Sequence, residues 1–296
     1  MTRLIRAEIY TLFKTRAFKV LCILALLSSF MLIGLTKLIS SEDFLKSSLK
    51  GMTEEQQEQF IEQLQNTNSE SSSAINSSSS IGFNITTSDL FNPAAREIFK
   101  GTFGNRVIEI FLAVLIGVMV AAEYSSGTIK NILAYGKKRE EYYLSKIIAS
   151  TVGMTILLAI MVSVSTIGTT ILFGWGKAFD INEVAYILKT FSAAVVVGMA
   201  IVSLLTLIAT LVKSNGSTIG IGIVVFVLLP TIVSFLYGRY TWFDKIFEAT
   251  PAYNWSVVTS IKSSSSDLLK SLAISLATFL VATVLGIMTF KKQDIK

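Results

Sequence analysis

The chain has 296 residues with a formal net charge of +6, and 52% of its residues are hydrophobic while only 16% are charged. Several apolar runs reach the ~20 residues that a helix needs to cross a bilayer, so the composition excludes an ordinary soluble domain and indicates an all-α integral membrane protein. The absence of histidine and the single cysteine, Cys22, exclude an intrachain disulfide and a zinc site of the Cys/His type.

The N-terminal segment, residues 1–19, carries five basic residues and one acid, with apolar residues at helical spacing. This pattern predicts an amphipathic helix in the membrane interface on the cytosolic side. The alternative is a plain positively charged anchor for the first span. A cleaved signal peptide is not expected, because the apolar run is long and no small-residue cleavage site follows it. The charged positions that we assign to this interface helix are Arg6, Glu8, Lys14 and Arg16.

Six apolar runs predict six transmembrane helices in one domain that covers residues 1–296. The expected spans are 20–38, 107–122, 147–173, 184–212, 218–237 and 268–290. Segments 1–19, 123–146, 213–217 and 291–296 together hold 14 Lys or Arg and 5 Asp or Glu. Segments 40–104, 174–183 and 238–267 hold 8 Lys or Arg and 14 Asp or Glu. The positive-inside rule then predicts that both termini are cytosolic.

The large first external segment, residues 40–104, is acidic and rich in serine. It is either a solvated loop or an element that gates or captures a substrate, since long loops are functional or disordered. Thr53 and Gln56 form a capping-box pattern that predicts a short helix near 54–65.

Charged, proline and glycine residues stand out in the second and fifth spans. Arg106 and Glu109 stand one helical turn apart at the outer end of the second span. A local ion pair is the simple explanation, and a polar lining for a translocation path is the alternative. In the fifth span Pro230 predicts a kink, and Gly216, Gly220 and Gly222 predict close helix packing.

The external segment 238–267 is rich in aromatic residues. An aromatic belt at the membrane interface explains this composition.

The cytosolic segment 123–146 is polar and basic and lies between the second and third spans. Ile129, Ile132 and Leu133 share one helical face, and Gly136 suits the end of that helix. A second helix is expected from about Glu140 into the third span. Spacing alone leaves two explanations: an ordinary positively charged loop, or a helix at the membrane surface that passes a push from a partner to two spans.

This segment resembles the cytosolic loop of ABC-2-type ABC transporter permeases. In that family a Glu ends the second span, a Gly-Thr opens the coupling helix, and an Arg followed by a Lys leads into the third span. The matching positions here are Glu123, Gly127, Thr128, Arg139 and Lys146. Residues 1–19 resemble the family's N-terminal connecting helix, and the rest of the chain is similar at the level of topology. The family carries short re-entrant helices at the place of segment 238–267, and Pro251 would suit the break between them.

The resemblance implies the membrane subunit of a bacterial ATP-driven exporter of the bacitracin, lantibiotic or peptide type. A separate ATP-binding subunit would dock on segment 123–146 and the N-terminal helix, and Ile129, Ile132 and Leu133 would pack into a cleft on it. Arg139 and Lys146 would hold the loop at the lipid surface, and Glu123 would pair with a basic group such as Arg139. Two permease subunits, identical or different, would assemble with two ATP-binding subunits.

The sequence offers no chemistry of its own for catalysis. It has no phosphate-binding G-x-x-x-x-G-K-[ST] motif and no G-x-S-x-G elbow. We therefore expect no enzyme activity, no bound metal and no cofactor in this chain, with ATP and Mg²⁺ on the partner subunit. Apolar spans that carry Ser and Thr but no buried charge cluster predict an amphipathic or lipid-like cargo. The resemblance implies that this cargo is an antimicrobial or other peptide, exported across the bacterial cytoplasmic membrane. The alternatives are a lipid or glycolipid exporter of the same type, or a membrane sensor or scaffold that transports nothing.

Overall fold

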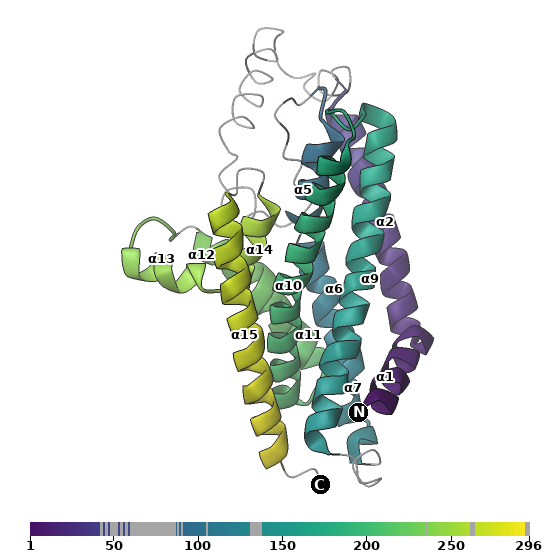
Figure 1. Cartoon of the computed structure of the whole chain (residues 1–296), viewed down its shortest axis with the longest axis vertical. Helices are drawn as coiled ribbons and strands as arrows, with labels where there is room; N and C mark the ends of the chain where they lie inside the picture. Colours follow the sequence, from purple (N-terminus) through teal and green to yellow (C-terminus); the bar gives the residue numbers. More distant parts are fainter. Residues whose placement is uncertain are drawn as a thin grey trace.

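The computed structural model describes residues 1–41, 91–104, 106–130, 138–234, 236–260 and 264–293, with a few single positions between 42 and 90. Every regular element among these residues is helical. Figure 1 shows a bundle of long helices with both chain termini at its lower end. The terms lower and upper below refer to that orientation.

Six helical segments of the described chain are long and apolar enough to cross a membrane, which indicates a multi-pass membrane protein and confirms the predicted spans. They are α2 (Arg16–Ile39), α6–η1–α7 (Val107–Ile116, Gly117–Ala121 and Ala122–Ser125), α9 (Arg139–Phe173), α10 (Ile181–Val212), α11–η2–α12 (Asn215–Ile223, Val224–Leu228 and Leu229–Ser234) and α15 (Ser265–Lys292). The shorter helices are α1 (Thr2–Lys14), α5 (Ala95–Gly104), α13 (Thr241–Glu248) and α14 (Pro251–Thr259).

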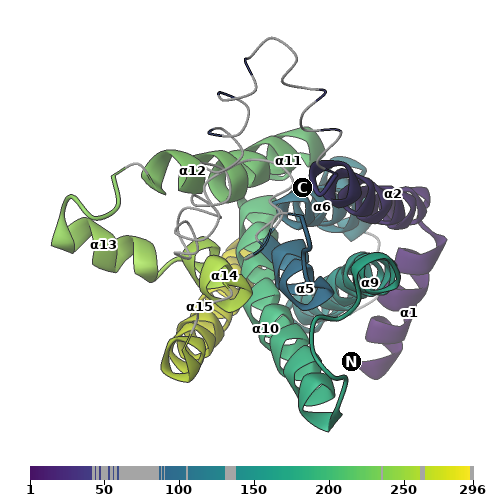
Figure 2. The ribbon, with the colours of Figure 1, turned by 90° about the horizontal axis from the view of Figure 1, so that it is seen from above.

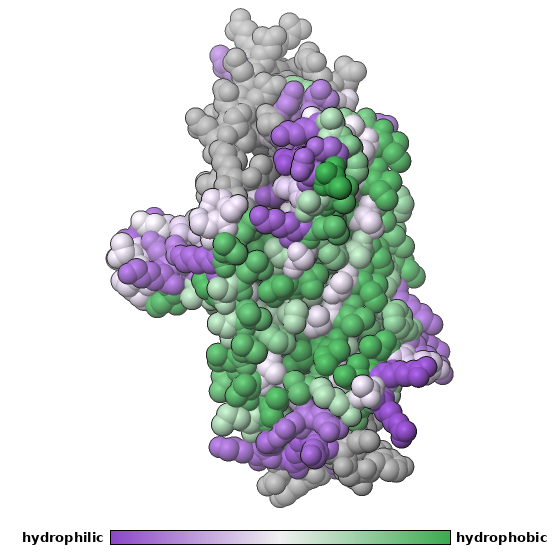
Figure 3. All heavy atoms as spheres, in the orientation of Figure 1, coloured by the Kyte–Doolittle hydropathy of each residue, from purple (hydrophilic) through white to green (hydrophobic). Residues whose placement is uncertain are grey.

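The surface of the bundle is divided into an apolar middle and hydrophilic ends. Figure 3 shows apolar residues over the middle of the bundle and hydrophilic residues at its lower end, near its top and on the laterally projecting α13. The helices α9 and α10 have 35 and 32 residues. At 1.5 Å per residue each is roughly 50 Å long, which exceeds the ~30 Å thickness of a bilayer core. Their ends therefore extend beyond the hydrocarbon region.

The N-terminal helix is shorter than the pattern over 1–19 predicts. It ends at Lys14, Thr15 has extended backbone dihedrals, and α2 begins at Arg16. Leu4, Glu8 and Leu12 are its buried residues, one turn apart from each other on a single face. This face packs against α9, which leaves the basic residues of α1 exposed.

The fifth span contains a π-helical turn, η2, beside the predicted break at Pro230. Proline has no backbone N–H, so Pro230 cannot donate to the carbonyl of Phe226 four residues earlier. That carbonyl instead accepts a hydrogen bond from Arg106 Nη1 at 3.0 Å. The proline in the fifth span thereby creates a polar contact with the start of the second span.

One of the three glycines predicted to allow close packing in the fifth span does so within this chain. A Cβ on Gly222 would lie 2.9 Å from side-chain atoms of both Ala113 and Leu205. Gly216 and Gly220 have no such neighbour within 4 Å. The second and fifth spans therefore approach each other at Gly222, while the other two glycines lie on open faces.

Segment 238–267 contains two short helices separated at Pro251, as predicted. Pro251 is the first residue of α14, and the Thr250 side chain caps that helix by accepting from the backbone N–H of Tyr253. The buried α14 is held by Trp255, whose Nε1 donates to the carbonyl of Phe103 at 2.8 Å. In contrast, α13 projects sideways from the bundle in both views (Figures 1 and 2).

The helix predicted near 54–65 lies outside the described residues. Of its capping box, one bond is present: the backbone N–H of Thr53 donates to Gln56 Oε1 at 3.2 Å.

Candidate functional site

A buried lysine joins three distant segments at the lower end of the bundle. The Lys146 side chain, on α9, is 1% exposed. Its Nζ lies 2.5 Å from Glu8 Oε2 on α1 and 2.5 Å from Glu123 Oε1 on α7. Glu8 and Lys146 are 138 residues apart in the chain. Because a buried charge is costly unless it is paired, this lysine fixes α1 and the end of the second span against α9. We call Glu8, Glu123, Tyr142 and Lys146 the Lys146 cluster.

A tyrosine completes the cluster. The Tyr142 hydroxyl donates to Glu123 Oε2, and Tyr142 stands one helical turn before Lys146 on α9, so both side chains reach the same carboxylate. The ring of Tyr142 stacks on Phe290 of α15, with 5.5 Å between centroids. The last span is thereby connected to the same group of residues.

The cluster holds two carboxylates and one ammonium group. Burial raises the pKa of the Glu8 carboxyl above its ordinary value, while the attraction and hydrogen bond of Lys146 oppose that rise and the nearby Glu123 charge adds to it. Glu8 is 8% exposed and Glu123 is 19% exposed at the side chain. Glu123 is therefore the member of the cluster that solvent or a partner reaches most easily.

Arg139 does not pair with Glu123, and this corrects the expectation from sequence. Its Nη1 donates to the carbonyls of Phe290, Lys291 and Gln293 at 3.2, 2.8 and 2.7 Å. A helix end leaves carbonyls without intrahelical partners, and the guanidinium satisfies them at the end of α15. Lys146 also differs from the expectation, because it is buried and so cannot hold the loop at a lipid surface.

The start of the predicted coupling helix is present. Gly127 has φ of +72°, a left-handed conformation that glycine adopts without strain, and a helical turn begins at Thr128. Ile129 is 1% exposed and packs inside the chain with Leu4 and Phe290, so it is not available to a partner's cleft as we had expected. Ile132, Leu133 and Gly136 lie outside the described residues.

The exposed surface around the cluster is basic. Arg6, Lys14 and Arg16 of the N-terminal segment are exposed, as are Lys130 and Lys138 on either side of residues 131–137. Of the four charged residues assigned to the interface helix, Glu8 alone is buried. A signal for its role was present in the sequence: one acid stands between Leu4 and Leu12 on an otherwise apolar face.

Arg106 and Glu109 form the predicted local ion pair, with 3.3 Å between Nη1 and Oε2 and side-chain exposures of 7% and 1%. Arg106 also bonds the Phe226 carbonyl described above. Both residues are buried, and Arg106 connects the second span to the fifth. The alternative, that they line a path, stays a prediction.

A second polar cluster, at the upper end, was not anticipated. Arg96 Nε lies 2.8 Å from Glu183 Oε2, which also accepts from Trp175 Nε1 at 3.1 Å. Lys100 Nζ donates to the carbonyl of Ser260 at 2.7 Å. These contacts tie α5 to α10 and to the end of α14, and we call Arg96, Lys100, Trp175 and Glu183 the upper cluster.

Comparison with known proteins places most of the chain in one family. A family model matches residues 75–296. The chain belongs to the family described as "Protein of unknown function (DUF2705)". The DUF2705 match includes Glu123, Tyr142 and Lys146, whereas Glu8 precedes it, so the Lys146 cluster joins the matched region to the N-terminal helix. No curated protein matches the chain.

Proposed function

We propose that this protein is the transmembrane subunit of an ABC-2-type ATP-driven exporter in the bacterial cytoplasmic membrane. The observation that carries the proposal is the Lys146 cluster, which ties α1, the end of the second span and the start of the third span into one unit. Arg139 adds the end of the sixth span. A force applied at this end would therefore reach several spans together.

The lower end is the cytosolic end in this proposal, because the positive-inside rule favours the side rich in Lys and Arg. A separate ATP-binding subunit would dock there, over residues 123–146 and α1, and would bind ATP and Mg²⁺. The sequence supports a separate driver because it has no phosphate-binding loop of its own. Two copies of the permease, or two related permeases, would assemble with two such subunits, as two-fold assemblies are common.

The proposed cargo is an amphipathic peptide, such as an antimicrobial peptide, that enters from the membrane. Apolar surfaces with Ser and Thr but few charges in the spans support such a cargo over a small ion. A lipid or glycolipid exporter is the second candidate, favoured by an apolar groove between α10 and α15.

Copurification tests the docking surface. The chain is coexpressed with a candidate ATP-binding subunit, and charge reversals are placed at exposed lower-end positions, Lys130→Glu and Lys138→Glu. We expect these variants to lose the partner while remaining in the membrane. The matched control is Lys177→Glu, an exposed lysine in the turn at the upper end, which should retain it. Equal recovery of the partner with all three variants would refute docking at this surface.

A further inference from the structure

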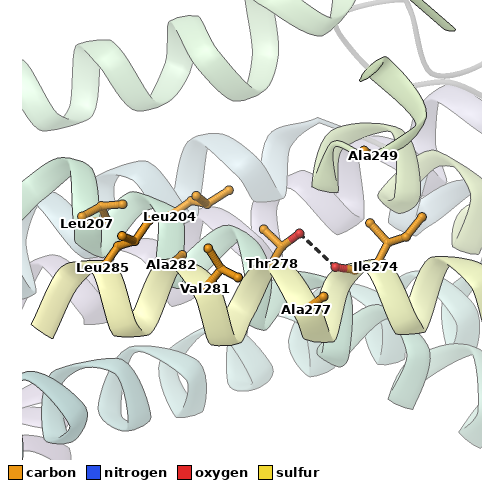
Figure 4. Close-up of a pocket in the computed structure, with 9 residues that line it drawn as sticks. All are labelled: Leu204, Leu207, Ala249, Ile274, Ala277, Thr278, Val281, Ala282 and Leu285. Carbon is orange, nitrogen blue, oxygen red and sulfur yellow. Dashed lines mark hydrogen bonds between the residues drawn. The ribbon is translucent and has the colours of Figure 1, made fainter. Parts of the chain in front are cut away.

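An apolar groove of about 350 Å³ lies between α10 and α15, a volume within the usual range of ligand sites. Figure 4 shows its lining, with α15 along one side and Ala249 above Ile274 and Thr278. The lining residues are Leu204 and Leu207 of α10, Ala249 after α13, and Ile274, Ala277, Thr278, Val281, Ala282 and Leu285 of α15.

The lining offers nothing for a polar ligand to bind. Thr278 carries its one side-chain hydroxyl, and that hydroxyl already donates to the carbonyl of Ile274 at 2.9 Å within α15. Every other lining side chain is aliphatic. An occupant of this groove is therefore held by apolar contact alone.

The length of the groove matches one leaflet of a bilayer. From Ile274 to Leu285 the helical rise gives about 16 Å, close to half of the ~30 Å hydrocarbon core. A single acyl chain fits both its length and its apolar lining.

A cation stands at the upper mouth of the groove. Lys270 lies one turn above Ile274 on the same face of α15, and its side chain is 65% exposed while it contacts Glu248 at 3.3 Å. Glu248 ends α13 and is followed by the groove residue Ala249. The projecting α13 exposes Trp242 and Ile246, the residue types that favour a membrane interface.

We infer that the groove binds one acyl chain of an anionic phospholipid from the upper leaflet. Lys270 contacts the phosphate, α13 lies at headgroup level, and the chain runs down α15 toward Leu285. This inference concerns a lipid site and stands whether or not the protein is an exporter.

Photocrosslinking tests the site on the full chain in lipid nanodiscs. The probe is a phosphatidylglycerol with a diazirine on one acyl chain, and crosslinked peptides are mapped by mass spectrometry. We expect labelling of the α15 and α10 peptides that line the groove. Ala277→Trp should lower that labelling roughly ten-fold, the factor for losing the burial of one or two methylene groups.

Exposed residues outside the lining supply matched controls. Leu276→Trp changes an exposed residue on the side of α15 that points away from the groove and should leave labelling unchanged. A second pair, Val281→Trp in the groove and Val284→Trp outside it, with wild-type exposures of 59% and 54%, serves if Ala277→Trp fails to fold. Lys270→Gln should weaken labelling by the phosphatidylglycerol probe while sparing a phosphatidylcholine probe.

Three results would overturn the inference. One is equal labelling in each groove variant and its control, which would mean that the labelling comes from bulk lipid around the protein and not from a bound lipid. Another is equal preference for both headgroups in the wild type. The third is efficient disulfide formation between two copies carrying Thr278→Cys, which would make the groove a protein interface.

Discussion

The two polar clusters hold the two ends of the bundle together in different ways. At the lower end one lysine, 1% exposed, satisfies two carboxylates from different segments. At the upper end Arg96 and Glu183 are 27% and 11% exposed, and Glu183 keeps a second donor in Trp175. Tyr142 likewise gives Glu123 a second donor at the lower end, so the difference lies in charge and burial. One buried lysine is the cation for two carboxylates at the lower end, whereas the ion pair at the upper end is more exposed to water. This contrast predicts which changes the protein tolerates.

The largest effect is expected from Lys146→Met. The change leaves two carboxylates near each other without their cation, and removal of one partner from a buried pair costs about 3–5 kcal/mol. We expect a marked fall in the thermal unfolding temperature of the detergent-solubilised protein. Lys138→Met, at an exposed position, is the control and should change stability by no more than about 0.5 kcal/mol. Similar melting of both variants would show that the cluster is not essential.

Gly286→Ala sharpens the description of the lower end. A Cβ on Gly286 would overlap the hydroxyl of Tyr143 on α9, so the aromatic packing around Phe290 must shift, at about 1–3 kcal/mol. Gly220→Ala is the matched change in an open helical position, with no neighbour within 4 Å. It should stabilise the helix by about 0.5–1 kcal/mol. The unfolding temperatures of both variants are compared with that of the wild type. A shift of both temperatures in the same direction would contradict our account.

A smaller effect is expected from Arg96→Met at the upper end. The pair is partly exposed, Trp175 still donates to Glu183, and Arg96 lies 4.2 Å from the Tyr186 ring centroid. Loss of the ion pair with Glu183 and of the contact with the Tyr186 ring should lower the free energy of unfolding by about 1 kcal/mol. The unfolding temperatures of Arg96→Met and Lys146→Met are measured side by side. A loss of stability in Arg96→Met as large as that in Lys146→Met would contradict the proposed difference between the two clusters.

A pH dependence of stability is expected at Lys100. Burial lowers the pKa of this lysine to about 8, and the positive charges of Arg96 and Lys189 add to that shift. Between pH 8 and the ordinary lysine pKa near 10.5, the unfolded chain binds the proton that the folded chain has released. Linkage then makes this residue's contribution to stability rise as pH rises through that window. Lys100→Met should remove that rise. The test is to measure the unfolding of the wild type and of Lys100→Met at pH 7.5, 8.5 and 9.5. A stability difference between the two proteins that stays the same at all three pH values would contradict the prediction.

Local patterns predicted the elements and the nearby contacts of this fold. The six apolar runs predicted the six long helices, the spacing of Arg106 and Glu109 predicted their ion pair, and Pro251 predicted the break before α14. Each of these depends on residues that are neighbours along the chain or on one helix.

Contacts between distant segments did not follow from the sequence in the same way. Lys146 meets Glu8 only because α1 folds back along α9, and no spacing of residues encodes that approach. Charge sign allowed several partners for Glu123, and Arg139 was the wrong choice, since its guanidinium reaches the end of α15. Ile129 was assigned to a partner's cleft on the family resemblance, whereas Leu4 and Phe290 cover it within the chain.

ATP hydrolysis by the assembled complex tests the central claim most directly. The ratio of the hydrolysis rate of the complex to that of the isolated ATP-binding subunit is measured for the wild type, Glu123→Gln and Glu183→Gln. Gln at 123 keeps an acceptor for Tyr142 but removes the charge that pairs with Lys146. Our account predicts that Glu123→Gln still assembles but loses the change in rate caused by complex formation, while the upper-end variant Glu183→Gln retains it. A wild-type ratio in Glu123→Gln would contradict the claim that the Lys146 cluster couples the partner to the spans.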